Sequence, residues 1–378
     1  MRASTLEELL PLEARAEARL ALQSTTLAGA FDIFRHVHAA VCSERALARV
    51  VREALEDAAA DGICYIELRS TPRLLRGGDV GGDEKENYDT ARALELPLNI
   101  EQRDAGLHRY VAVVGAALVD AAAAMPQLVA RLLVSLDRGA SEDSRAACAR
   151  VAVLWSSERV CGLAPSPHSF TRLVVGVDVS GDPRKGGDIS STIIPTLDAL
   201  RDAGLCVSFH LGEMAGAAAD AETAAILKWR PDRVGHLALV GPLSIAVLAS
   251  LGPAAPPVEV CPTSNALTLS LESLHAHPTL GERLAARMRI AICTDDPSIF
   301  KTTLSRELEV VALAFLLNRR DVARLSAASF DYAFAEPHVV ALGKDRAIKR
   351  FKEEGGMGME QNGRAGAGAT AGVGAAVK

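Results

Sequence analysis

Short apolar runs alternate along the chain with longer stretches in which apolar residues recur every three or four positions. Apolar runs bounded by turn residues are typical of buried strands, and the longer periodic stretches are typical of amphipathic helices. The predicted strands span 63–68, 128–136, 173–179, 206–209, 234–236, 258–261 and 290–293. A helix or helix-like stretch follows each of them, for example at 106–124, 190–203, 217–228, 243–250 and 304–317. This alternation predicts an α/β fold with parallel strands.

Local signals divide the chain further. Ser43 can cap a helix that runs to about Ala60, and Gly62 can stop it. Residues 77–87 are rich in glycine and charge, which predicts a loop. The low-complexity sequence from Gly355 onward cannot bury a core and is predicted to be disordered. We therefore predict an N-terminal remnant at 1–30, a main domain at 31–354 and a disordered tail at 355–378.

Residues that can bind metal or move protons follow three of the predicted strands. His210 and Glu213 come at the end of the strand 206–209, and His236 ends the next strand. Asp295 and Asp296 follow the last strand. In (β/α)₈ barrels the active site lies at the carboxyl ends of the strands, so these side chains are expected to meet. Imidazoles and carboxylates in such a place predict metal-assisted hydrolysis.

Composition excludes several other classes of protein. The net charge is -6 and aromatic residues make up 4% of the chain, with no basic cluster interleaved with aromatics, which argues against binding nucleic acid. The seven cysteines are scattered and never spaced C-x-x-C, as expected for free thiols in a reducing compartment. The apolar segment 111–125 is broken by Asp120 and too short to span a membrane. We expect a cytoplasmic protein with no membrane partner and no signal peptide.

Five motifs in this order resemble the adenosine/AMP deaminase family of zinc aminohydrolases. They are Ser180-Gly181-Asp182, His210-Leu211-Gly212-Glu213, Gly235-His236, Cys261-Pro262-Thr263-Ser264-Asn265 and Thr294-Asp295-Asp296-Pro297. The resemblance covers roughly residues 30–350. The stretch Glu67 to Arg73 is most similar to the adenosine deaminase-like subgroup, which removes methylamine from N6-methyl-AMP. The resemblance implies a TIM barrel of the metal-dependent hydrolase type and one zinc per chain. We expect a monomer whose partner is a small purine nucleotide or nucleoside.

The resemblance also implies roles for the strand-end residues. His210 and Asp295 match zinc ligands, and Glu213 matches the carboxyl group that gives a proton to purine N1. His236 matches the histidine that orients and deprotonates the attacking water. Asp296 matches the carboxylate that hydrogen-bonds the purine and the attacking hydroxide. Taken alone, each histidine could be a buried core residue, and Glu213 could be a carboxylate favoured by the start of a helix.

A second group of residues is predicted to hold the substrate. Gly181 lets its backbone N–H approach a planar base closely, although a turn glycine would look the same. Ser70, Thr71 and Arg73 offer hydroxyls and a guanidinium suited to a phosphate, and Pro72 between them sets a turn. His38 and Asp137 match substrate-contacting positions of the same subgroup by their spacing. These residues favour a nucleotide over a nucleoside.

One family element has no counterpart in the sequence. The family begins with a strand bearing His-x-His, which places two zinc ligands on one side of the strand. By its distance from Ser70 to Arg73 the motif should fall before Met1. His36 and His38 lie in a predicted helix, where positions i and i+2 point to nearly opposite sides, so this pair is rejected as a replacement. The pair His275 and His277 is rejected because it shows no strand pattern.

Three interpretations therefore compete. The first is a zinc aminohydrolase that converts N6-methyl-AMP to IMP and methylamine, or adenosine to inosine and ammonia, recorded without its first strand. The second is a metal-poor pseudoenzyme that binds a nucleotide. The third is an interaction protein on an eroded barrel. The presence of Glu213, His236 and Asp296 favours the first.

Overall fold

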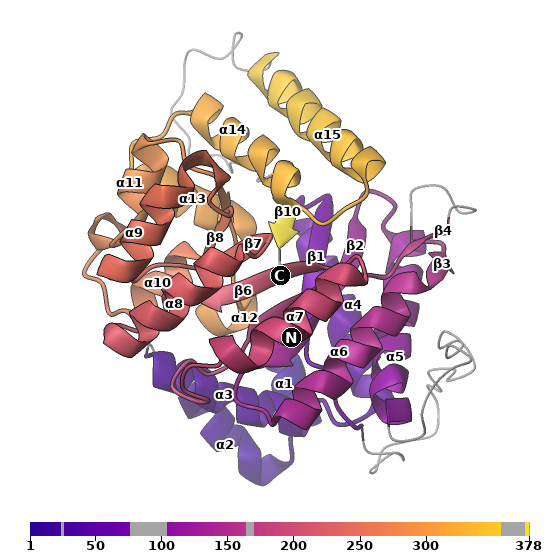
Figure 1. Cartoon of the computed structure of the whole chain (residues 1–378). Helices are drawn as coiled ribbons and strands as arrows, with labels where there is room; N and C mark the ends of the chain where they lie inside the picture. The colour runs from indigo at the N-terminus through magenta and orange to yellow at the C-terminus, as the bar shows by residue number, and fades with distance from the viewer. Residues whose placement is uncertain (24–25, 76–103, 164–169, 357–374, 378) are drawn as a thin grey trace. The chain divides into compact units, whose positions relative to one another are not determined.

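The computed structural model describes residues 1–23, 26–75, 104–163, 170–356 and 375–377 (Figure 1). These residues form two compact units. Unit 1 comprises Met1–Asp57, Leu68–Val207 and Leu267–Ser270, and unit 2 comprises Ala58–Glu67, Ser208–Ala266 and Leu271–Lys378. The predicted loop at 77–87 lies outside the described residues.

The strands of unit 1 include a long parallel pair. Strand β2 (Val129–Asp137) pairs with β5 (Val174–Ser180), with Val134 opposite Val177. Both strands are buried along nearly their whole length, as expected for parallel strands covered on both faces. A short antiparallel pair, β3 (Arg159–Cys161) and β4 (Phe170–Arg172), was not predicted. The helices of this part of the chain are α1 (Ala3–Leu9), α2 (Leu12–Ala21), α3 (Leu27–Ala40), α4 (Glu44–Ala60), α5 (Ala105–Ala124), α6 (Glu142–Ser157) and α7 (Ser190–Asp202).

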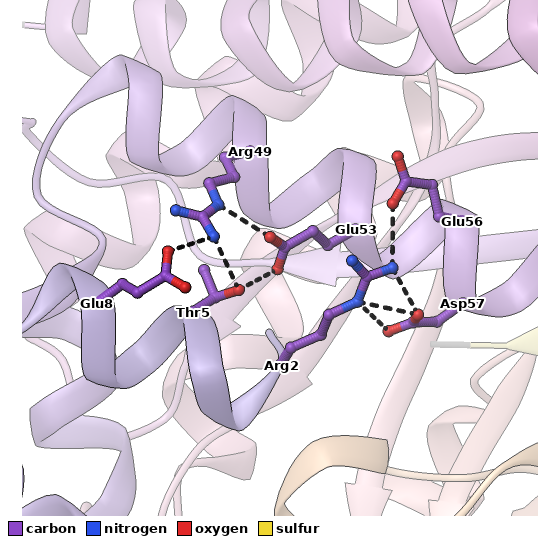
Figure 2. Close-up of polar contacts among 7 residues, drawn as sticks. All are labelled: Arg2, Thr5, Glu8, Arg49, Glu53, Glu56 and Asp57. Atoms are coloured by element: carbon purple, nitrogen blue, oxygen red, sulfur yellow. Dashed lines mark hydrogen bonds and ion pairs between the residues drawn. The ribbon is translucent and has the colours of Figure 1, made fainter.

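Most of the described residues before position 30 lie in helices α1, α2 and the start of α3, where the sequence predicted an N-terminal remnant. Figure 2 shows how side chains of α1 and α4 meet in unit 1. The Thr5 hydroxyl donates to Glu53 Oε2 at 2.6 Å, and Arg49 Nε lies 2.9 Å from Glu53 Oε1. Arg2 Nη2 donates to Asp57 Oδ1 at 2.8 Å. Burial works to raise the pKa of Glu53, but the bonds from Thr5 and Arg49 outweigh it and lower that pKa. These contacts fasten α1 to α4.

Helix α5 contributes a large part of the core of unit 1. Among the described residues, α5 is the one helix that is long and apolar enough, by length and composition alone, to cross a membrane. However, 61% of its apolar window is buried against the rest of the protein, and this burial is typical of a core helix. Its fully enclosed positions include Val111, Ala112 and Val113.

Four successive strands, β6 to β9, pair in parallel in unit 2. Strand β6 (Cys206–Leu211), which begins in unit 1, pairs through His210 with Gly235 of β7 (Arg233–His236). Strand β7 pairs with β8 (Val258–Val260), and β8 pairs with β9 (Ile290–Ile292). All seven predicted strands are therefore present, since 63–68 corresponds to β1 (Tyr65–Ser70). The helices that follow are α8 (Ala217–Trp229), α9 (Pro242–Leu251), α10 (Pro262–Thr268), α11 (Leu280–Ala285), α12 (Pro297–Phe300), α13 (Leu304–Ala314), α14 (Arg319–Ser329) and α15 (Pro337–Gly356).

The end of the chain contains a short strand that the sequence did not predict. Strand β10 (Ala375–Val377) pairs in parallel with Tyr65–Glu67 of β1. The backbone groups at the edge of a strand can pair with any extended segment, so low sequence complexity does not prevent this. The predicted disorder therefore does not apply to these three residues, nor to Gly355 and Gly356, which end α15. For 357–374, which lie outside the described residues, disorder stays a prediction.

A charged network is buried in the interior of unit 2. Arg233 is fully buried and lies between two carboxylates, with Nη2 2.5 Å from Glu67 Oε2 and Nε 2.6 Å from Glu259 Oε1. The hydroxyl of Tyr65 donates to Glu67 Oε1 at 2.7 Å, and the guanidinium carbon of Arg233 lies 3.5 Å from the centre of the Phe334 ring. A buried charge is tolerated only when it is paired in this way.

Asp220, a residue of α8, caps the N-terminus of α9. Its carboxylate accepts from the N–H groups of Gly241 at 3.1 Å, Leu243 at 2.9 Å and Ser244 at 3.0 Å, and from the Ser244 hydroxyl. Burial works to raise the pKa of Asp220, but these hydrogen bonds outweigh it, so the pKa lies below its usual value. The ionised carboxylate therefore stabilises the folded state at pH values above the pKa of an unfolded aspartate.

We expect Asp220→Asn to lower the free energy of unfolding by about 1–2 kcal/mol at pH 7, since the amide loses acceptors for buried N–H groups. The difference in the free energy of unfolding between the wild type and this variant should fall as the pH drops below about 4, because the unfolded and then the folded aspartate take up a proton. Urea unfolding at pH 7 and pH 3 measures the free energy of unfolding of wild type and variant. Asp345→Asn, at an exposed position of α15, is the control. The same difference at both pH values would contradict a contribution from the charge of Asp220.

Candidate active site

The residues of unit 2 that were predicted to bind metal or transfer protons lie together at the carboxyl ends of β6, β7 and β9. We call His210, Glu213, His236, Asp295 and Asp296 the strand-end cluster. The rings of His210 and His236 lie edge to face, with their centroids 5.1 Å apart. His236 Nε2 lies 3.7 Å from Glu213 Oε1 and 3.8 Å from Asp295 Oδ2. One imidazole nitrogen thus faces two carboxylates at the strand ends.

The backbone turns sharply where these strands end. His236 and Leu237 have φ values of 55° and 45°, and Asp295 has a φ of 57°. Such left-handed backbone is uncommon for residues other than glycine and concentrates at functional sites. Gly212 is also left-handed, and a Cβ at this position would lie 2.6 Å from the carbonyl oxygen of Leu239. Gly212 is therefore required between His210 and Glu213.

The two adjacent aspartates have different surroundings. Asp295 Oδ2 accepts a hydrogen bond of 2.7 Å from the hydroxyl of Ser264, which lies in α10 directly after β8. Burial raises the pKa of Asp296 to about 6. Asp296 therefore takes up a proton more readily than an ordinary aspartate does. Ser264 belongs to a family motif for which no role of its own was predicted. Its position just after a predicted strand is the feature of the sequence that could have indicated this contact.

Donor atoms of the strand-end cluster and of the neighbouring Cys261 fit a zinc ion. Among the residues that the structure describes, His236, Cys261 and Asp295 each place one ligand atom within 4.8 Å of the others, and all three are buried. Imidazole nitrogen, thiolate sulfur and carboxylate oxygen are the ligands that zinc takes in proteins. Asp295 was predicted as a ligand, and Cys261 was not. His210, the other predicted ligand, contacts His236 through its ring, and its ligand role stays a prediction.

The predicted substrate residues other than Asp296 lie in unit 1. We call His38, Ser70, Arg73, Asp137 and Gly181 the substrate cluster. Partial burial and the positive charge of Arg73 lower the pKa of His38, and Asp137 opposes them. A Cβ at Gly181, which has a φ of 111°, would lie 2.3 Å from Asp137 Oδ1, so glycine is needed there. His38, Arg73, Asp137 and Gly181 thus lie near one another, and their binding of substrate stays a prediction.

Further contacts hold the substrate cluster in place. The Ser70 hydroxyl lies 2.6 Å from the hydroxyl of Tyr110, a buried residue of α5 that sequence reasoning missed. Burial raises the pKa of Tyr110, although the bond with Ser70 and the charge of Arg73 oppose this shift. Arg73 Nη2 donates to the carbonyl of Val41 at 3.0 Å, while Arg73 remains partly accessible. Thr71 is half-buried and Pro72 is buried beside them.

The sequence matches the family model described as adenosine deaminase over residues 10–341. The chain belongs to the adenosine deaminase family. A relative from Arabidopsis thaliana, named N6-mAMP deaminase, is 29% identical over 322 residues, covering 83% of this chain and 81% of the relative. The family assignment makes the chain a hydrolytic deaminase and confirms the predicted family.

Solved structures agree on the fold of this adenosine deaminase family member. The crystal structure of Arabidopsis ADAL complexed with IMP matches with a TM-score of 0.70 at 24% identity, covering 94% of each chain. An amidohydrolase from Burkholderia ambifaria with bound Zn matches with a TM-score of 0.64 at 19% identity, covering 87% of this chain and 80% of the other. These likenesses confirm the predicted α/β fold of the TIM-barrel type. Metal dependence is general to the family, and the number of zinc ions per chain stays a prediction.

Proposed function

We propose that this chain hydrolyses N6-methyl-AMP to IMP and methylamine. The observation that carries the proposal is the convergence of Glu213 and Asp295 on the Nε2 atom of His236. This arrangement supplies an acid, an oriented imidazole and a carboxylate at one place, as hydrolysis at a purine carbon requires. The name of the Arabidopsis relative and the guanidinium of the substrate cluster support a nucleotide with a methylated amine.

The reaction adds the oxygen of water to C6 of the purine and breaks the bond between C6 and the methylamine nitrogen. Glu213 donates a proton to N1 as the oxygen attacks, so that no full negative charge builds up on the ring. His236 orients the attacking oxygen, and Asp296 hydrogen-bonds the purine. Of the two protons of the attacking water, one passes to the Asp296 carboxylate and from there restores Glu213, and the other leaves with methylamine as C6 becomes a carbonyl carbon.

Zinc fits the same cluster, with His210 and Asp295 as the proposed ligands and Cys261 as a further donor close to Asp295. When bound, zinc acidifies water so that a nucleophile forms near neutral pH. The pairing of β6 with β7 positions His236 beside His210, since His210 lies opposite Gly235 and Leu211 opposite His236.

Arg73→Ala tests the nucleotide part of the proposal. We expect kcat/KM for N6-methyl-AMP to fall by about 10-fold to 100-fold, because a charge-assisted hydrogen bond to phosphate contributes about 1.5–3 kcal/mol. The kcat/KM for N6-methyladenosine, which lacks the phosphate, should change by less than about 3-fold. Arg73→Lys keeps the charge and should retain an intermediate rate.

The comparison of substrates separates the competing interpretations. Equal losses for nucleotide and nucleoside would remove the phosphate role of Arg73. A wild-type preference for adenosine would favour the conversion of adenosine to inosine. Binding of AMP without turnover of any 6-aminopurine by the zinc-loaded protein would favour a pseudoenzyme.

A further inference from the structure

His277 is buried directly before α11, and its ring has a defined proton position. Its Nδ1 accepts hydrogen bonds from the backbone N–H groups of Thr279 at 3.2 Å and Leu280 at 3.1 Å. A backbone N–H can only donate, so His277 Nδ1 carries no proton. Burial also lowers the pKa of His277 to about 4, in keeping with a neutral ring. The single ring proton of His277 therefore lies on Nε2.

The carboxamide of Asn265 connects this ring to His236. Asn265 Oδ1 lies 2.9 Å from His236 Nδ1, and Asn265 Nδ2 lies 2.9 Å from His277 Nε2. With the amide placed this way, Nδ2 and the protonated Nε2 would be two donors facing each other. The oxygen and nitrogen of a carboxamide exchange places by a half-turn, and hydrogen bonding decides between the two orientations.

The turned amide satisfies every group in the chain of contacts. Asn265 Oδ1 then accepts from His277 Nε2–H, and Asn265 Nδ2–H donates to Nδ1 of His236. Because Nδ1 of His236 is an acceptor, the proton of its neutral ring lies on Nε2. Asn265 and both histidines are buried, where unmatched polar groups are rare.

We infer that His277 and Asn265 act as positioning residues that fix His236 as the Nε2–H tautomer and make it a hydrogen-bond donor in the strand-end cluster. Its Nε2–H then faces Glu213 Oε1 and Asp295 Oδ2. A donor at this place orients the attacking oxygen, and its protonated Nε2 takes up neither the proton of that oxygen nor a zinc ion, which leaves His210, Cys261 and Asp295 as the donors for zinc. This role differs from the predicted one, in which His236 deprotonates the attacking water. The tautomer is independent of the proposed function, and only its effect on turnover rests on that function.

The segment that follows His277 also holds the backbone of His236. Arg283, a buried residue of α11, donates to the carbonyl of Leu237 at 2.7 Å and to that of His236 at 3.4 Å. The Thr279 hydroxyl donates to the same Leu237 carbonyl at 3.4 Å. His236 and Leu237 are the two consecutive left-handed residues, so this segment supports a conformation that the residues would not adopt alone. Ring and backbone of His236 are thus positioned by one stretch of sequence.

Nuclear magnetic resonance of the full-length protein, grown with ¹⁵N-labelled histidine, measures the tautomers directly. Long-range proton–nitrogen spectra at pH 7.5 should show His236 and His277 with a protonated Nε2 and an unprotonated Nδ1. The ring signals that disappear in His236→Asn belong to His236, and those that disappear in His277→Gln belong to His277. A protonated Nδ1 on either assigned ring in the wild-type protein would overturn the inference.

The variant Asn265→Asp tests the consequence for turnover. A carboxylate only accepts, so it favours a proton on Nδ1 of His236 and reverses the tautomer. We expect this reversal in the spectra, with kcat for N6-methyl-AMP lowered by about 10²-fold or more and KM changed by less than about 3-fold. Asn318→Asp, the same change at an exposed helix cap, is the control. A reversed tautomer with full kcat would refute the positioning role.

The two arms separate this inference from the proposed function. If the wild-type protein turns over no 6-aminopurine, the proposed function fails, and the spectra still decide the tautomer.

Discussion

Replacing Glu213 by Gln is expected to lower kcat for N6-methyl-AMP by at least about 10²-fold, with the zinc content unchanged. The carboxamide keeps the shape of the side chain but has no acidic proton for purine N1. The role predicted for Glu213 is that of a proton donor and not of a zinc ligand, so metal binding should not depend on it. Steady-state kinetics and elemental analysis of zinc per chain measure the two quantities.

Glu272→Gln is the matched control, because the same change is made at an exposed position. Full activity in Glu213→Gln would sink the assignment of Glu213 as the proton donor. A parallel loss of zinc and activity would instead place Glu213 among the metal ligands.

Replacing Arg233 by Met is expected to lower the free energy of unfolding by about 3–5 kcal/mol, as measured by urea unfolding at pH 7. Methionine fills much of the same volume but leaves Glu67 and Glu259 as buried carboxylates with no cation between them. The cost therefore comes mainly from charges that have lost their partner.

A triple variant separates this cost from packing. Arg233→Met combined with Glu67→Gln and Glu259→Gln removes all three charges and should recover most of the lost stability. If the triple variant is as unstable as Arg233→Met alone, packing around the guanidinium dominates. A loss below about 1 kcal/mol in Arg233→Met would contradict the role of the buried charges.

The strands and the strand-end residues could be predicted because each depends on a short stretch of sequence. Continuous apolar runs marked β2 and β5, and His236 and Asp295 follow such runs directly. The parallel arrangement then brings strand ends to one side, whatever lies between them. His210, Glu213, His236 and Asp295 were found in this way.

Other features depend on partners that are distant in sequence, and periodicity carries no signal for them. Asn265 lies 29 residues from His236 and 12 residues from His277, so their contacts arise only when β7, α10 and the segment before α11 are folded. His277 drew attention as a possible metal ligand and was rejected for that role, yet it is buried for another purpose. The pairing of Arg233 with Glu67 was likewise invisible, because charged residues inside strands look exposed in sequence.

Helices α1 and α2 were missed for a different reason. Their apolar positions are few, and charged side chains contribute to their attachment. Arg2, directly before α1, pairs with Asp57 of α4, and Glu8 of α1 pairs with Arg49 of α4. Arg19 of α2 pairs with Glu7 of α1. A pattern of burial cannot reveal an element that is fastened by polar groups.

The left-handed backbone at His236, Leu237 and Asp295 bears on how this enzyme can be engineered. Glycine would relieve that backbone at each of the three positions, at the loss of an imidazole or a carboxylate in two of them. Selection for heat resistance alone would thus favour substitutions that remove chemistry, the usual conflict between stability and activity. A library for thermostable variants should therefore keep these codons fixed and seek its gains in the surrounding helices.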